Sequence, residues 1–340
     1  MNILFIGGTG NISTACTHLA LSRGHKLTLL NRSRRETLLG TEQLTVDIND
    51  LATAEAALTH RHWDAVVDFI AFTSDDIERR IALFRGKVGQ YFFLSSASAY
   101  QKPVMNIPIT ESTPLVNPFW KYSRDKIACE ERLTRALRDE AFPAVIIRPS
   151  LTYGDTIVPL AVNSWEKSYT IVDRMRRHLP VIVPGDGLSR WTITHNSDFA
   201  KGLVGLLGQE KAIGHAFHIT SDEALTWNQF YLATAHAAGV EEPKLVHIAS
   251  DFITTCLPEM TGSLLGDKSY TAIFDNTKIR SFVPDFQATT PYAEGIARTI
   301  AWFDTDERRR LIDTSANINW DKLIAAYEQG LKKARLDFGT

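Results

Sequence analysis

The chain has 340 residues, of which 44% are hydrophobic, 22% charged and 10% aromatic. This composition is typical of a globular chain with one large or two modest domains, and it excludes disordered, collagen-like and disulfide-stapled proteins. Thirty-seven Lys and Arg against 39 Asp and Glu leave a formal charge of −2, so no global positive field attracts nucleic acid or anionic lipid.

The cysteines and the first residues indicate the compartment. Cys16, Cys129 and Cys256 lie more than a hundred residues apart, which fits reduced thiols. The chain enters an apolar run directly, without a basic leader, and no stretch approaches the roughly 18 apolar residues of a membrane span. We therefore expect a cytoplasmic protein with no membrane partner.

The first half alternates short apolar runs with helical patterns, as parallel strands joined by crossover helices do. The expected strands cover residues 3–6, 26–30, 44–48, 65–71, 90–95 and 144–147. The expected helices between them cover residues 11–24, 50–60, 75–85 and 122–141. This order predicts an α/β fold with a Rossmann-type doubly wound parallel sheet.

The pattern breaks between Ser98 and Tyr122, where four prolines indicate a stiffened binding loop or lid. Further on, we expect helices at 165–178, 197–208, 226–238, 291–303 and 320–336, and strands at 181–183, 215–219 and 244–248. The predicted dinucleotide-binding domain covers residues 1–153 plus about 192–222. A smaller, partly interleaved substrate domain is expected at about 154–191 and 223–340.

A glycine-rich turn links the first strand to the first helix. Gly7 and Gly10 allow a tight turn whose backbone N–H groups approach a pyrophosphate at the helix N-terminus. Ser13 takes the third small position, which keeps close packing but blurs the motif. The alternative is an ordinary strand-to-helix turn.

The residues at the end of the second strand indicate which cofactor is preferred. Asn31 and Arg32 are followed by Arg34 and Arg35, and no carboxylate stands there for a ribose 2′-hydroxyl. Guanidinium groups suit a 2′-phosphate, so NADP(H) is favoured over NAD(H), although a solvated basic loop has the same composition. Asp47 and Ile48 after the third strand are expected to bracket the adenine; an Asp there also serves as a turn former.

Tyr122 and Lys126 lie one helical turn apart on the same face of a predicted helix. They are the only such Tyr and Lys pair at this spacing, and they follow the serine-rich end of the fifth strand, residues 95–98. A surface Tyr and Lys on an amphipathic helix is the alternative.

Taken together, these motifs resemble the extended short-chain dehydrogenase/reductase family, the NAD-dependent epimerase/dehydratase group. The motifs that carry the resemblance are the GGTGN turn, Asp47-Ile48, residues 94–100, Glu111 to Pro114, Tyr122-x-x-x-Lys126, Arg148-Pro149, Tyr153-Gly154, residues 184–187 and His195-x-x-Asp198. They span about 220 residues, and residues 221–340 match only loosely.

The resemblance implies roles for individual residues. Tyr122 would be the general acid/base, Lys126 its electrostatic partner and ribose anchor, and Ser96 a hydrogen-bond donor to the reacting oxygen. The implied cofactor-binding residues are Gly7, Gly10, Asn11, Ile12, Asn31, Arg32, Asp47, Ile48, Ala71, Tyr122 and Lys126. The implied substrate-binding residues are Ser98, Tyr153, Arg190 and Trp191, and no metal is expected.

Two differences from the motifs of this family narrow the range of expected reactions and substrates. Ala97-Ser98 stands where 4,6-dehydratases of this family carry Asp-Glu, which disfavours elimination of water. Trp191 stands where sugar-nucleotide epimerases typically carry a diphosphate-binding Arg, with Arg190 one position earlier. Arg174, Arg176 and Arg177 suit either an anionic substrate or a solvated helix face.

We therefore expect an NAD(P)-dependent oxidoreductase or epimerase that transfers hydride at a secondary alcohol or ketone of a sugar-like or nucleotide-sugar small molecule. The alternative is a dinucleotide-binding sensor or an RNA-binding scaffold of the same fold, although the charge of −2 argues against a nucleic-acid partner. A homodimer is also expected from the family. Its candidate interface residues, equally suited to packing on the sheet, are Ile81, Leu83, Phe84, Ile127 and Leu133.

Overall fold

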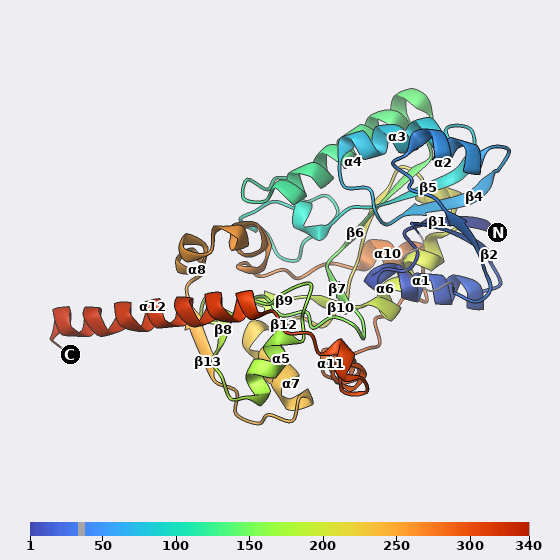
Figure 1. Cartoon of the computed structure of the whole chain (residues 1–340). Helices are drawn as coiled ribbons and strands as arrows, with labels where there is room; N and C mark the ends of the chain where they lie inside the picture. Colours follow the sequence, from blue (N-terminus) through green and yellow to red (C-terminus); the bar gives the residue numbers. More distant parts are fainter. Residues whose placement is uncertain (33–37, 340) are drawn as a thin grey trace. The chain divides into compact units, whose positions relative to one another are not determined.

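The computed structural model describes residues 1–32 and 38–339 (Figure 1). The chain divides into two compact units, the first formed by residues 1–152, 194–222 and 274–289. The second contains residues 153–193, 223–273 and the segment from residue 290 onward. Residues 274–289, which the sequence pattern groups with the substrate domain, belong to the first unit because Ile279 and Phe286 complete its core. The assignment of the two units to dinucleotide and substrate stays a prediction.

A seven-stranded parallel sheet forms the centre of the first unit, in the order β11-β6-β5-β4-β1-β2-β3. The strands are β1 (Asn2–Ile6), β2 (Lys26–Asn31), β3 (Thr41–Thr45), β4 (Trp63–Asp68), β5 (Val88–Leu94), β6 (Ala144–Pro149) and β11 (Ala216–Ile219). The strand order runs outward in both directions from β1 and β4, which confirms the predicted doubly wound sheet.

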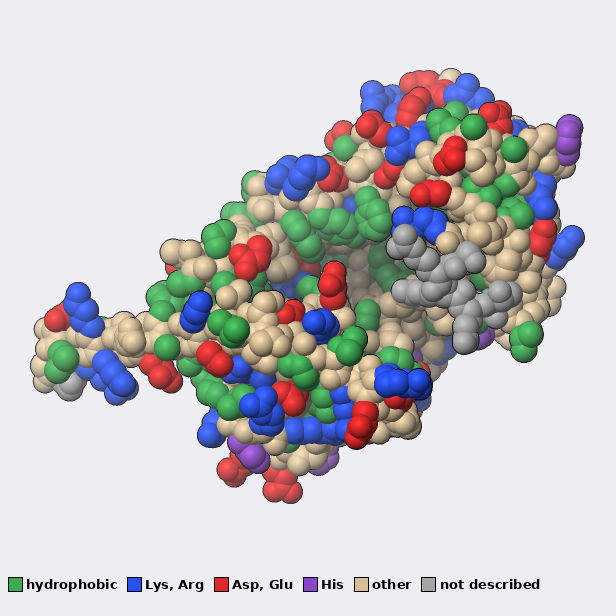
Figure 2. Space-filling model, in the orientation of Figure 1, with side chains coloured by type: hydrophobic (Ala, Val, Ile, Leu, Met, Phe, Trp, Pro, Cys, Tyr) green, Lys and Arg blue, Asp and Glu red, His purple; other side chains and the backbone are tan. Residues whose placement is uncertain are grey.

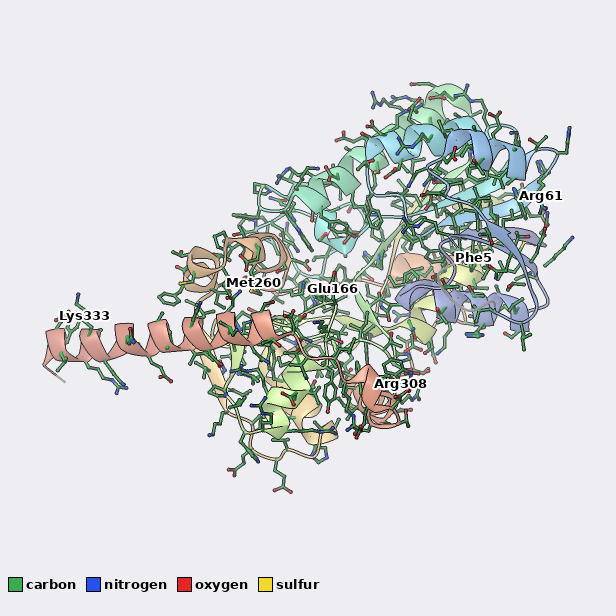
Figure 3. The ribbon with its side chains drawn as sticks, viewed as in Figure 1. Phe5, Arg61, Glu166, Met260, Arg308 and Lys333 are labelled. Carbon is green, nitrogen blue, oxygen red and sulfur yellow. The ribbon has the colours of Figure 1, made fainter. Side chains whose placement is uncertain are left out.

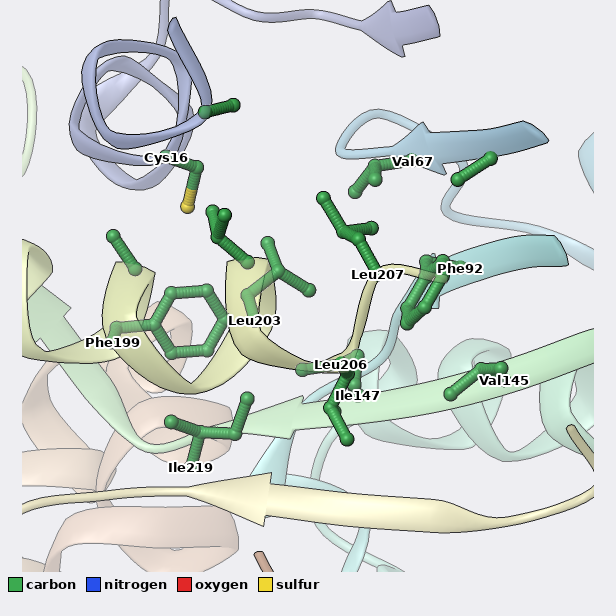
Figure 4. Packing of buried hydrophobic residues seen from close by; sticks show 14 of the residues in the cluster. Cys16, Val67, Phe92, Val145, Ile147, Phe199, Leu203, Leu206, Leu207 and Ile219 are labelled. Atoms are coloured by element: carbon green, nitrogen blue, oxygen red, sulfur yellow. The ribbon is translucent and has the colours of Figure 1, made fainter. Parts of the chain in front are cut away.

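Helices cover both faces of this sheet, so neighbouring residues of one strand enter different cores. Phe5 joins the core under α1 and α6, which contact each other, whereas Leu4 joins the core under α2, α3 and α4. Figure 4 shows the first core, with Phe199 and Leu203 of α6 beside Cys16 of α1. The helices are α1 (Asn11–Ser22), α2 (Leu51–Leu58), α3 (Ser74–Phe84), α4 (Lys121–Glu140), α6 (Asn196–Leu206) and α10 (Thr277–Phe282), with short 3₁₀ turns η1 (Ala97–Ala99) and η2 (Glu210–Ala212).

The third strand differs from its prediction. It covers Thr41–Thr45, three residues before the apolar run at 44–48, because its backbone pairs with β2 from Leu27↔Thr41 to Asn31↔Thr45. As an edge strand it is only half buried, so its apolar content is a poor guide to its bounds.

The expected dimer contacts also need correction. Ile81, Leu83, Phe84 and Leu133 are at most 5% exposed and belong to the core between the sheet and helices α3 and α4. Sheet packing, the alternative reading, accounts for these four side chains, and only Ile127 remains partly exposed.

The second unit contains short strand pairs and helices. Its paired strands are β8 (Val181–Pro184) with β13 (Leu245–Ile248), and β9 (Arg190–Trp191) with β12 (Leu225–Thr226). Its helices are α5 (Thr170–Arg176), α7 (Trp227–Ala237), α8 (Ser250–Cys256), α9 (Thr261–Ser263), α11 (Tyr292–Asp304) and α12 (Thr314–Phe338), with short 3₁₀ turns η3 (Pro258–Met260) and η5 (Glu307–Arg309) and a π turn η4 (Leu264–Lys268). Two further strands, β7 (Leu151–Tyr153) and β10 (Ile193–His195), pair with each other where the chain passes between units. No helix in the described chain is long and apolar enough to cross a membrane.

Candidate active site

The turn after β1 is closed by a side chain. The Ser13 hydroxyl accepts the Gly10 N–H at 2.7 Å and donates to the Gly7 carbonyl at 2.7 Å, so serine ties the turn together where a third glycine is usual. Gly7 has a φ of +86°, and a Cβ added there would lie 2.6 Å from Ile70 Cγ2. Both its backbone conformation and the lack of space therefore require glycine at residue 7.

Asn11 and Ile12 begin the helix that follows this turn. The Asn11 side-chain amide donates to the Thr152 carbonyl at 2.9 Å, while its Oδ1 is buried and has no hydrogen-bond partner among the described residues. The Asn196 amide donates to the Asn11 carbonyl, and Ile12 packs against the core. Asn11 therefore carries a buried acceptor at the start of α1.

The residues expected to contact the adenosine half of the cofactor lie after β2 and β3. Asn31 ends β2, and Arg32 and Asp47 are exposed. Asp47 accepts the Asn49 N–H at 3.0 Å, and Ile48 is buried. Arg34 and Arg35, which belong to the predicted phosphate-binding cluster, lie outside the described residues.

Lys126 is buried at the carboxyl ends of β4 and β5, with 2% of its surface exposed. Its ammonium donates to the carbonyls of Ala71 at 2.7 Å and Leu94 at 2.6 Å. The rings of Phe72 and Phe93 lie 4.5 and 4.8 Å from Nζ and the Tyr122 ring 5.8 Å away, measured to ring centroids. Burial lowers the pKa of Lys126 to about 8.

A buried ion pair holds the loop that receives Lys126. Asp68 ends β4, accepts the N–H groups of Ile70 and Ala71 at 2.9 Å each, and pairs with Arg80 Nε at 2.9 Å. The Tyr91 hydroxyl also donates to Asp68, which raises the pKa of Tyr91 further above the value that burial produces. Sequence reasoning missed Asp68, although one charged residue at the end of an apolar strand was a usable signal.

The serines after β5 form a chain of hydroxyl groups. Ser98 bonds the Ser96 hydroxyl at 2.9 Å and accepts a hydrogen bond from Ser123 of α4 at 2.7 Å. Ser123 is adjacent to Tyr122, so these bonds tie the Ser96 turn to the start of the Tyr122 helix. The Tyr122 ring packs 5.0 Å from the Trp120 ring. The first unit thus carries Ser96, Ser98, Tyr122, Lys126 and the glycine turn at the carboxyl edge of its sheet, and Ser123 is the member that sequence reasoning missed.

The other substrate candidates belong to the second unit. Tyr153 is buried, and its hydroxyl donates to the Tyr292 carbonyl at 3.4 Å. Both Nε and Nη2 of Arg190 donate to the Ala224 carbonyl, at 3.1 and 3.0 Å. Trp191 is 2% exposed and stacks on Trp227 with 6.0 Å between ring centroids. These contacts hold the second unit together, and a role in substrate binding stays a prediction.

The comparison with known proteins decides the family. The family model described as "NAD dependent epimerase/dehydratase family" matches residues 3–220. The chain belongs to this family. It is an NAD-dependent enzyme of the extended short-chain dehydrogenase type, and the predicted resemblance is confirmed.

Individual relatives of the chain are distant in sequence. A 2′-dehydrokanamycin reductase of Streptomyces kanamyceticus is 25% identical over 70% of this chain and 67% of its own length. The chloroplast stem-loop binding protein of 41 kDa b of Arabidopsis thaliana is 26% identical over 72% of this chain and 65% of its own length. The structure of Thermus thermophilus UDP-glucose 4-epimerase in complex with NAD has a TM-score of 0.71 at 18% identity, covering 89% of this chain and 99% of that one. This last likeness shows the fold alone.

The residues of the first unit fit a pyridine nucleotide. The turn leaves no room for a side chain at Gly7, and Asn11 presents a buried acceptor beside it. Within the described chain, two of the three N–H donors of Lys126 are bound to carbonyls, which leaves one for a ligand. The strand order changes direction between β1 and β4, where ligands of this fold class bind.

Proposed function

We propose that the chain is an NAD(P)-dependent oxidoreductase or epimerase acting at a secondary alcohol or ketone of a sugar-like substrate. The observation that carries the proposal is the buried Lys126 ammonium, held at the carboxyl edge of the sheet one helical turn after Tyr122. The relative named as a reductase and the epimerase of the same fold support this class of reaction.

The protein residues supply the proton in this proposal. The Lys126 ammonium lies 5.8 Å from the centroid of the Tyr122 ring, where its charge would stabilise the phenolate that Tyr122 forms on releasing its proton. Tyr122 then takes the proton of a substrate hydroxyl, or returns it to a carbonyl oxygen. Ser96 donates a hydrogen bond to the same oxygen, and its bond to Ser98 orients it.

The cofactor would be held by the glycine turn, Asn11 and Lys126, with Arg32 at the 2′-phosphate of NADP(H). A bound nicotinamide would supply the hydride donor or acceptor. The exposed position of Arg32 after β2 supports the preference for NADP(H), because a guanidinium group can pair with a phosphate there.

We favour a substrate without a nucleotide diphosphate. Arg190 is bound to the Ala224 carbonyl, and Trp191 is buried. Arg174 is 1% exposed and bonded to Pro180, Asn317 and Asp321, and Arg176 pairs with Asp304. Of the three helix arginines, Arg174 and Arg176 are thus bonded within the second unit, and Arg177 forms a surface pair with Asp173, as a solvated helix face predicts. None of these contacts favours a diphosphate.

The experiment is a screen of sugar ketones, sugar alcohols and nucleotide sugars, followed by nicotinamide absorbance with both cofactors. Turnover of a non-nucleotide sugar that is lost in Tyr122→Phe would support the proposal. Full turnover by Tyr122→Phe on an identified substrate would refute it.

The relative named as a stem-loop binding protein favours a second candidate function, RNA binding on the same fold. Filter binding with a stem-loop RNA tests it, because affinity based on phosphate contacts falls steeply as salt is added. We expect no such binding from a chain with a charge of −2.

A further inference from the structure

The C-terminal half of α12 has no packing partner in its own unit. The helix begins after Asp313, whose carboxylate accepts the Ala316 N–H at 3.0 Å, and its first half packs Trp320, Leu323 and Ile324 into a core. From Glu328 onward every described residue is exposed. Figure 1 shows this end of α12 extending past the strands and helices of its unit. Lys333 lies on this projecting part of the helix (Figure 3).

Residues 328–338 extend the packed first half of α12 by about three turns. Because they continue an existing helix they carry no nucleation cost, but no buried side chain stabilises them. Gly330 within the segment lowers its helix stability by about 1 kcal/mol relative to alanine. A contact along this segment would supply the stability that its sequence alone does not.

The apolar side chains of α12 follow a coiled-coil spacing. Steps of four and three residues alternate along Trp320, Ile324, Tyr327, Leu331, Ala334 and Phe338. The first two are buried in the unit and Tyr327 packs against the same core, whereas Leu331 and Phe338 are 44% and 85% exposed. The stripe that anchors the helix therefore continues into solvent on the same face.

We propose that this stripe is an interface with α12 of a second copy of the chain, paired antiparallel. With the two-fold axis between Leu331 and Ala334, Leu331 faces the Ala334 of the other copy, and Tyr327 faces its Phe338. Leu331 then packs on the small Ala334 near the centre of the contact, and the two large rings, Tyr327 and Phe338, meet at its ends, where there is more space.

The charges beside the stripe select this arrangement. Glu328 and Arg335 occupy the same flank of the stripe, so antiparallel pairing brings Glu328 of each copy close to Arg335 of the other, twice by symmetry. In a parallel pair Arg335 would face Gly330 and gain no ion pair. Lys332 and Lys333 lie on the outer side, where Figure 2 shows basic side chains around the free end of the helix.

The proposed contact is short, so the dimer should be weak. Stable interfaces bury at least about 1,200 Å² in total, and a helix pair of about three turns lies at or below that range. We therefore expect dissociation at micromolar dilution. Because the ion pairs are exposed, they set orientation more than strength.

Sedimentation velocity of the full chain across a concentration series tests the proposal. The wild type should shift with concentration toward twice the 38.0 kDa mass of one chain. Leu331→Asp should stay at the single-chain mass throughout. Leu336→Asp, which changes an 80% exposed leucine on the opposite side of the same helix, should behave as the wild type.

Two results would overturn the proposal. One is a wild type that stays monomeric at the highest concentration. The other is a Leu331→Asp variant that dimerises as Leu336→Asp does, which would place any dimer contact on another surface such as α4. All these residues lie beyond the packed part of α12, so a folding defect would not explain a monomer, and circular dichroism checks this.

A charge exchange tests the orientation separately. Glu328→Arg and Arg335→Glu should each weaken dimerisation, because each places like charges together across the antiparallel pair. The double variant should restore it, since both ion pairs form again with their signs reversed. Failure of the double variant to recover would contradict the antiparallel arrangement.

Discussion

The two units use their charged side chains in different ways. In the first, Lys126 is buried at the end of the sheet with one donor left for a ligand. In the second, Arg174, Arg176 and Arg190 are bound to carbonyl oxygens and carboxylates of their own unit. Basic residues of equal charge are thus expected to serve chemistry in one region and are bonded into the fold in the other, and only their contacts tell them apart.

The largest effect is expected at Tyr122, the proposed acid/base of the first unit. Tyr122→Phe should lower turnover by about 10²–10⁴-fold, the usual contribution of a positioned proton donor, with little change in cofactor affinity. Steady-state turnover together with nicotinamide fluorescence measures both. Tyr270→Phe in the second unit serves as the control and should retain activity.

The ion pair that holds the Lys126 loop should matter mainly for stability. Asp68→Asn leaves the Arg80 guanidinium buried without its counter-charge, so we expect a loss of about 3–5 kcal/mol in the free energy of unfolding. Urea unfolding measures it. Asp64→Asn, at the exposed amino-terminal end of the same strand, keeps an oxygen for the Asn2 N–H and should cost less than about 1 kcal/mol. Equal losses in the two variants would contradict the role given to Asp68.

Lys126 itself should give a pH-dependent difference in stability. Its pKa is about 8 in the folded chain and near the ordinary value of 10.5 when unfolded, so the unfolded chain holds more protons between these values. The wild type should therefore gain stability relative to Lys126→Met as pH rises from 8 to 10.5, by about 3 kcal/mol in total. Lys121 is exposed on the same helix, so the difference in stability between the wild type and Lys121→Met should not rise over this pH range. A flat difference for Lys126→Met would mean that the ammonium is not desolvated.

The smallest effect is expected at Arg190. Arg190→Met removes the two hydrogen bonds to the Ala224 carbonyl and should cost about 1–2 kcal/mol in unfolding free energy, with cofactor affinity unchanged. Arg177→Met removes only a surface pair with Asp173 and is the control. A large loss of turnover on a nucleotide sugar, with stability intact, would show instead that Arg190 binds substrate.

The regular part of the molecule could be predicted because its pattern repeats. Buried parallel strands produce continuous apolar runs, and their carboxyl ends meet at one edge, so the glycine turn, Ser96, Tyr122 and Lys126 could be placed there from the sequence. The predicted position of the edge strand β3 was wrong by three residues, because backbone pairing with β2, not apolar content, determines its bounds.

Other features could not be read from the sequence because they depend on contacts between distant segments. Asp68 and Arg80 pair across 12 residues, and Ser98 and Ser123 across 25. The arginines of the second unit bond to partners as much as 147 residues away. Short strands and turns in that unit carry little periodicity, so their contacts had no local signal.

Binding of a pyridine nucleotide at the carboxyl edge of the first unit can be measured directly. Titration of NADPH and NADH, followed by nicotinamide fluorescence, tests it on the wild type, Gly7→Ala and Arg32→Ala. We predict micromolar binding to the wild type, a marked loss in Gly7→Ala because a Cβ there would collide with Ile70, and a loss for NADPH alone in Arg32→Ala. Binding of neither nucleotide by the folded wild type, or equal binding by folded Gly7→Ala, would contradict the account.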